Sequence, residues 1–79
     1  MEDRSVLEEL AQDDRSWVSE RASLALQMLD QHEGGGLDEF EFQDIMNRIV
    51  ASSDLDREAD DLDTKAALVT AVLAAGGCI

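Results

Sequence analysis

Apolar residues in the middle of the chain recur at the spacing of one helix face. They stand at positions i, i+3, i+4, i+7 and i+8, the period of an amphipathic α-helix: Phe42, Ile45, Met46, Ile49 and Val50. Proline is absent, and β-branched residues do not alternate with polar ones, so β-strands have little support. We therefore expect an all-α protein, a small bundle of about four helices that forms one domain over residues 1–79.

Capping and turn signals place the first two helices. Ser5 and Glu8 form a capping box that opens a short first helix. Asp13-Asp14 offers an N-cap for a second helix of about four turns, which Gly34–Gly36 end because three glycines disfavour continued helix. The inward face of this second helix is expected to comprise Val18, Ala22, Ala25, Leu26 and Leu29, widened by Trp17, Leu24 and Met28. Trp17 is expected to anchor the core.

The second half of the chain contains two further helices. Asp38 and Glu41 form another capping box, which opens the helix with the clearest apolar period. Ser52–Asp54 break that helix, and an acidic stretch up to Asp63 leads into the last one. Gly76-Gly77 are expected to end the last helix. Its inward residues are predicted to be Leu62, Ala66, Val69, Val72 and Leu73.

The glycine-rich loop between the second and third helices has the spacing of a calcium loop. The first, sixth, eighth, ninth and twelfth loop positions are occupied by Asp30, Gly35, Leu37, Asp38 and Glu41. Residues 21–50 therefore resemble a degenerate single EF-hand. This resemblance implies a calcium site whose ligands are Asp30, Asp38 and Glu41.

Two loop positions depart from the EF-hand pattern. His32 and Gly34 stand at the third and fifth positions, where the family carries oxygen-bearing side chains. No second loop accompanies this one, so the resemblance implies at most weak, millimolar calcium binding. A plain helix–turn–helix hairpin explains the same residues, because Asp38 and Glu41 also form the capping box.

Acidic residues dominate the charge of the chain. Nineteen Asp and Glu face six Lys and Arg, which gives a net charge of −13. From Asp30 to Asp63 there are twelve acidic residues and only two arginines. Such a surface repels nucleic acid and anionic lipid and steers association toward basic partners. We therefore expect neither direct nucleic-acid binding nor membrane binding.

The densest group of carboxylates suggests a function. Duplex DNA presents one charge per about 1.7 Å of its axis, and acidic residues on adjoining helix turns approach that density. The leading hypothesis is a protein–protein interaction module, a nucleic-acid-mimicking inhibitor or regulator of a basic nucleic-acid-binding protein. In size and charge it is similar to phage anti-CRISPR and anti-restriction proteins. The residues expected to contact the partner are a first acidic cluster of Asp54, Asp56, Glu58, Asp60, Asp61 and Asp63, and a second acidic cluster of Asp38, Glu39 and Asp44.

Three alternatives remain open from the sequence. The acidic stretch can be an ordinary solvated helix face. The chain can be a helical subunit or chaperone of a larger assembly, self-association included, that binds through apolar faces such as Val69–Ile79. It can also be a weak calcium binder through the EF-hand-like loop.

Nothing in the sequence has the spacing of a catalytic constellation or of a zinc site. We therefore expect a non-enzymatic protein without a cofactor, calcium at the EF-hand-like loop being the one candidate. The single cysteine, Cys78, excludes an intramolecular disulfide and suits a reducing compartment. The N-terminus lacks a secretory signal, and the longest apolar run, Ala66–Ala75, is too short to span a bilayer. A cytoplasmic location is expected.

Overall fold

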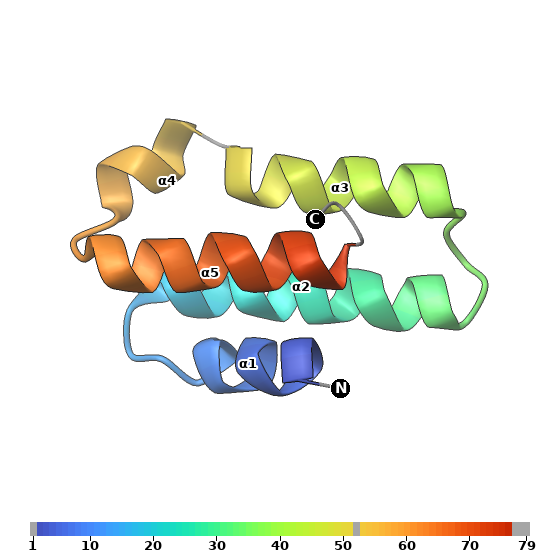
Figure 1. The fold of residues 1–79 in the computed structure, drawn as a ribbon, viewed down its shortest axis with the longest axis horizontal. Coiled ribbons are helices and arrows are strands. Elements are labelled where there is room, and N and C mark those ends of the chain that lie inside the picture. The colour runs from blue at the N-terminus through green and yellow to red at the C-terminus, as the bar shows by residue number, and fades with distance from the viewer. Residues whose placement is uncertain (1, 52, 77–79) are drawn as a thin grey trace.

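Five helices form a small all-α bundle in the computed structural model, which describes residues 2–51 and 53–76 (Figure 1). They are α1 (Glu2–Ala11), α2 (Ser16–Glu33), α3 (Glu39–Ala51), α4 (Ser53–Glu58) and α5 (Leu62–Ala75). The predicted fold class is confirmed. None of these helices is long and apolar enough to cross a membrane within the described part of the chain.

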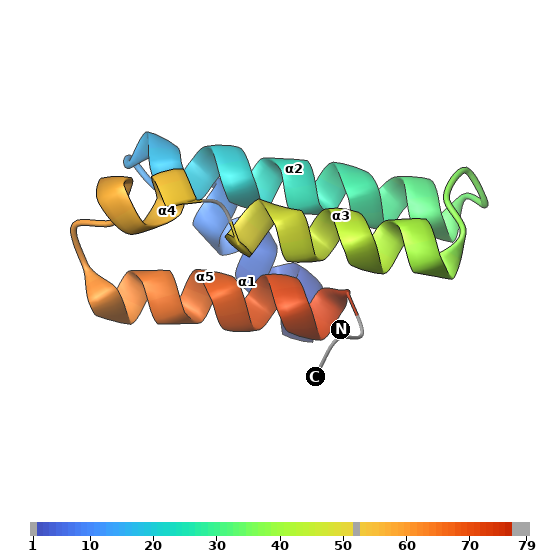
Figure 2. The same cartoon turned by 90° about the horizontal axis from the view of Figure 1, so that it is seen from above.

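The three long helices share the long axis of a molecule that measures 35 × 23 × 20 Å. Figure 2 shows α2, α3 and α5 running side by side, and each of the three packs against the other two. α1 packs against α2 and α5 on the side away from α3. The short α4 lies between the end of α3 and the start of α5, at one end of the molecule (Figure 1).

All five helices contribute to one buried apolar cluster. Its members are Leu7, Trp17, Val18, Ala22, Ala25, Phe42, Met46, Ile49, Leu55, Leu68, Ala71 and Val72. Trp17 is buried, as predicted for an anchor of the core. The α3 face is also as predicted, because Phe42, Met46 and Ile49 are buried while Ile45 and Val50 pack against the cluster.

The first two helices begin at residues other than those predicted. α1 already begins at Glu2, so Ser5 lies inside the helix and the predicted capping box with Glu8 is wrong. Residues 2–4 contain no helix breaker, and the helix therefore extends through them. α2 begins at Ser16, because Asp13 Oδ1 accepts a hydrogen bond from the backbone N–H of Arg15 (2.9 Å) and holds a turn ahead of the helix.

The glycines end α2 as predicted. Gly34 is the C-cap, and Gly35 adopts φ +83°, a left-handed conformation that favours glycine. The chain then enters α3 through Asp38, whose Oδ1 accepts a hydrogen bond from the backbone N–H of Glu41 at 2.7 Å. The N-cap of α3 predicted at Asp38 is therefore confirmed.

The acidic stretch folds differently from the prediction. Its first half forms a separate short helix, α4, rather than an irregular lead into α5. On α5 the predicted inward positions Leu62 and Ala66 are exposed, and Leu68 and Ala71 are buried instead. The apolar residues of α5 are distributed around the whole helix, so their spacing in the sequence is compatible with more than one buried face. Gly76 is the C-cap of α5, as predicted, whereas Ser52 and Gly77 lie outside the described residues.

Candidate partner-binding surface

The first acidic cluster occupies α4, the turn into α5 and the first turn of α5. Its six carboxylates all lie on the surface, with Asp61 half-buried and the other five exposed. Five of the six nevertheless have defined partners within the molecule. Asp54 pairs with Arg57 one turn along α4, at 2.6 Å. Asp63 is the member without an ion pair to any described residue.

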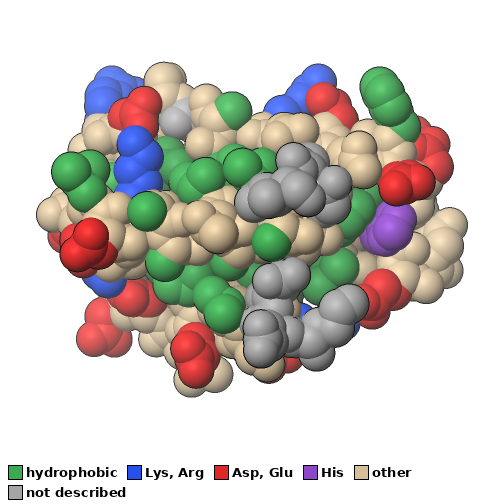
Figure 3. Space-filling model, viewed as in Figure 1, with side chains coloured by type: hydrophobic (Ala, Val, Ile, Leu, Met, Phe, Trp, Pro, Cys, Tyr) green, Lys and Arg blue, Asp and Glu red, His purple; other side chains and the backbone are tan. Residues whose placement is uncertain are grey.

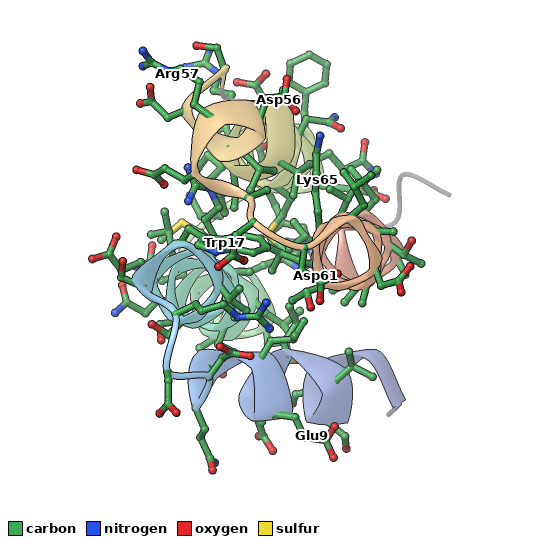
Figure 4. All side chains as sticks on the ribbon, turned by 90° about the vertical axis from the view of Figure 1, so that its left-hand side faces the viewer. Glu9, Trp17, Asp56, Arg57, Asp61 and Lys65 are labelled. Atoms are coloured by element: carbon green, nitrogen blue, oxygen red, sulfur yellow. The ribbon has the colours of Figure 1, made fainter. Side chains whose placement is uncertain are left out.

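Two ion pairs connect α4 to the long helices. Glu58 Oε2 lies 3.1 Å from Arg21 Nη1 on α2, and Asp56 pairs with Lys65 on α5. Figure 4 shows Lys65 reaching from α5 toward Asp56, whereas Arg57 points away from the bundle. Arg21 also donates a hydrogen bond to the carbonyl oxygen of Trp17 at 3.0 Å. These carboxylates therefore help to hold α4 in place.

Arg15 links the start of α2 to the turn before α5. Its guanidinium donates to Asp13 at 3.0 Å and 3.1 Å, to Asp60 at 3.3 Å and to the Thr64 hydroxyl at 3.0 Å. These carboxylates, Asp13 foremost, raise the pKa of Arg15. In return, hydrogen bonds from the Arg15 side chain and backbone lower the pKa of Asp13. The guanidinium also lies 5.5 Å from the centre of the Trp17 ring, a cation–π distance.

Asp61 is the N-cap of α5. Its Oδ2 accepts a hydrogen bond from the Thr64 hydroxyl at 2.7 Å, and its Oδ1 accepts one from the backbone N–H of Asp63 at 3.1 Å. These two bonds, in that order, are the main cause of a lowered pKa at Asp61. The carboxylate is therefore ionised and fixed in position at neutral pH.

The second acidic cluster is distributed along α3. Asp38 caps the helix, Glu39 is exposed in its first turn, and Asp44 pairs with Arg48 at 3.2 Å. The start of α3 and α4 lie at opposite ends of the molecule (Figure 1). The structure therefore does not bring the two predicted clusters together into one surface.

Every basic side chain in the chain is engaged by a carboxylate. The six are Arg4, Arg15, Arg21, Arg48, Arg57 and Lys65, and between them they pair with ten acidic residues. Figure 3 shows basic side chains lying beside acidic ones on one face. Seven described carboxylates are exposed and have no ion pair to a described residue: Glu9, Asp14, Glu20, Asp38, Glu39, Glu41 and Asp63. The sequence analysis missed Glu9, Asp14 and Glu20, because no local signal separates paired from unpaired acids.

The residues of the EF-hand-like loop are engaged in interactions other than metal binding. α2 continues to Glu33, so Asp30 and His32 lie in its last turn and not in the loop. Arg4 pairs with Asp30 and with Glu33, the latter at 3.0 Å, and these hydrogen bonds raise the pKa of Arg4. The His32 ring stacks on Phe42, with ring centres 4.2 Å apart and planes inclined by 13°.

The three carboxylates predicted to bind calcium therefore have separate roles. Asp30 pairs with Arg4, Asp38 caps α3, and Glu41 is exposed on α3. Over residues 2–51 and 53–76, no group of three or more His, Cys, Asp or Glu side chains could hold a metal ion. The fold does not assemble Asp30, Asp38 and Glu41 into such a group, because the helical end of α2 directs Asp30 to α1.

Comparisons with protein-family models, with curated proteins and with solved structures found no match. The function is therefore inferred from the residues of this chain alone.

Proposed function

We propose that this protein is a non-enzymatic, acidic interaction module that binds a basic protein whose own ligand is nucleic acid. One observation carries the proposal: all six Lys and Arg side chains are paired with carboxylates of the same chain. The described charged side chains without an ion pair are therefore all acidic, while the exposed Arg48 and Arg57 are each paired with an aspartate. A protein of net charge −13 associates fastest with a basic surface.

The internal ion pairs are compatible with binding to a partner. A carboxylate can accept about four hydrogen bonds, and one arginine uses only part of that capacity. The pairs of Glu58 with Arg21 and of Asp56 with Lys65 therefore orient these carboxylates without saturating them. A pre-oriented set of anions loses less side-chain entropy on binding than a set on a flexible tail.

The proposal defines how the protein would act. Basic grooves bind phosphates through Arg and Lys, and carboxylates pair with the same groups. The module would compete with nucleic acid for its partner, as inhibitors of the anti-CRISPR and anti-restriction kind do. We place it in the cytoplasm, where a lone Cys78 thiol remains reduced.

Affinity capture from the native host at low and high salt tests the proposal. We expect one dominant basic partner that is retained at about 50 mM salt and released at about 500 mM, because screening shortens the range of charge attraction. The D60K/D63K variant should lose the partner while its helicity, measured by circular dichroism, is unchanged. The E9K/E41K variant alters the net charge equally at distant sites and should retain it.

A partner that is retained at high salt by the wild type and by the D60K/D63K variant would refute the proposal. That result would favour a second function, a helical subunit of a larger assembly. A shallow apolar hollow between α1 and α5, lined by Val6, Ala66, Ala67, Thr70 and Ala71, favours this alternative. It lies on the middle of α5, and Thr70 and Ala71 belong to the predicted segment Val69–Ile79, of which residues 77–79 lie outside the described part of the chain.

A further inference from the structure

A groove between α2, α3 and α4 combines apolar and acidic residues. It is lined by Glu20, Arg21, Leu24, Ile49, Asp54 and Glu58. Leu24 was predicted to face the core, but 42% of it is exposed, whereas Ile49 is buried. The groove therefore has an apolar part provided by two side chains and a rim that carries three carboxylates.

We propose that this groove binds a long cationic side chain, lysine or arginine, from the basic partner. The inference rests on the proposed function and adds the place and the chemistry of the contact. The aliphatic stem of such a side chain packs on apolar surface while its charged end remains at a polar rim. Leu24 and Ile49 would contact the stem, and Glu20 and Asp54 would pair with the charged end.

The charge of the groove is not cancelled from within. Arg21 is the one basic residue that lines it, and its side chain is only 14% exposed. Its guanidinium already donates to the Trp17 carbonyl at 3.0 Å and to Glu58 at 3.1 Å. Asp54 pairs with Arg57, which does not line the groove, at 2.6 Å, and Glu20 has no ion pair with a described residue. Three carboxylates and one guanidinium line the groove, so the lining residues together remain negative.

The same charges argue against a second copy of this chain as the occupant. Each copy carries a net charge of −13, and its six basic side chains are already engaged by its own carboxylates. An anionic ligand would be repelled by the carboxylates at the rim. A purely apolar ligand would remove these carboxylates from water without giving them a partner. A cation with an aliphatic stem satisfies both parts of the groove.

Octalysine titrated into the full chain is the test, with binding followed by calorimetry and by NMR of methyl groups. In wild type we expect the Leu24 and Ile49 methyl signals to shift and those of Val6 on α1 to stay. E20K should weaken octalysine binding about fivefold or more, and the matched variant E9K about twofold or less, since a direct pair is stronger than a distant screened charge. Figure 4 places Glu9 on α1, on the side of the bundle away from α4.

A second matched pair tests the apolar part of the groove. L24S should weaken octalysine binding, whereas V6S, at a valine that is 38% exposed and does not line the groove, should not. If E20K and E9K weaken binding equally and the Leu24 methyls do not shift, the groove proposal is wrong although the acidic module still binds cations. If wild type fails to bind octalysine at low salt, the proposed function fails as well.

Discussion

Replacing Leu55 with alanine should detach α4 from the bundle. A six-residue helix is far below the length of about 12–15 residues at which isolated helices become even marginally stable. α4 therefore depends on tertiary contacts. Leu55 is its one buried side chain, with no exposed surface, and the ion pairs of Asp56 and Glu58 also connect it to α5 and α2.

The size of the effect follows from these contacts. Truncating a buried leucine costs about 2–5 kcal/mol. The loss of unfolding free energy is limited here, because α4 can detach from the bundle instead of leaving an empty cavity in the core. Detachment also breaks exposed ion pairs, which contribute only about 0.2–1 kcal/mol each. We expect the free energy of unfolding to fall by about 2–3 kcal/mol, out of a total of about 4–12 kcal/mol for a chain of this length.

Urea denaturation and native-state hydrogen exchange measure the two consequences. The amide of Ala59 donates to the Leu55 carbonyl at 2.9 Å, so its exchange reports on α4. It should accelerate by about 30- to 150-fold in Leu55→Ala, the ratio that corresponds to the predicted energy. Leu62→Ala, at an exposed leucine, should change stability by less than about 0.5 kcal/mol. Equal costs for the two variants, or unchanged Ala59 exchange, would refute the reasoning.

Three further predictions concern caps, turns and pH. Asp38→Ala should lower the free energy of unfolding by about 1 kcal/mol in urea denaturation, because the Glu41 N–H loses its cap, and Asp38→Asn should recover most of the loss. Gly35→Ala should cost about 1–2 kcal/mol through its positive φ alone, since no atom of the described residues would crowd the new methyl group, and Gly35→Asn should cost less. The pKa values of Asp13 and Asp61 are lowered in the folded protein, so the ionised carboxylates stabilise the fold at pH values above the ordinary pKa of 3.8. This stabilisation is lost as the pH falls below 3.8 and through the lowered pKa values. Thermal unfolding between about pH 6 and pH 2 should therefore show a falling Tm, with a shallower fall in Asp61→Asn; an identical slope in the variant would exclude this account.

Local signals along the chain accounted for much of the fold. The apolar period of α3, the N-cap at Asp38 and the glycine stop after α2 each depend on neighbours within a few residues, and they folded as predicted. The buried face of α5 could not be predicted, because its apolar residues surround the helix and packing alone selects Leu68 and Ala71. The helical state of residues 53–58 was missed for a similar reason, since Leu55 stabilises it through burial against the rest of the core.

Some properties of the candidate site follow from the sequence, and others follow only from the tertiary structure. Composition alone establishes that the molecule is an anion of net charge −13, because charge adds up whatever the fold. Which carboxylates are paired depends on distances in space between residues far apart in the chain. Arg21 meets Glu58 across 37 positions and Arg15 meets Asp60 across 45. The groove depends on tertiary structure in the same way. Only the fold places Asp54 and Glu58 of α4 beside Leu24 of α2 and Ile49 of α3.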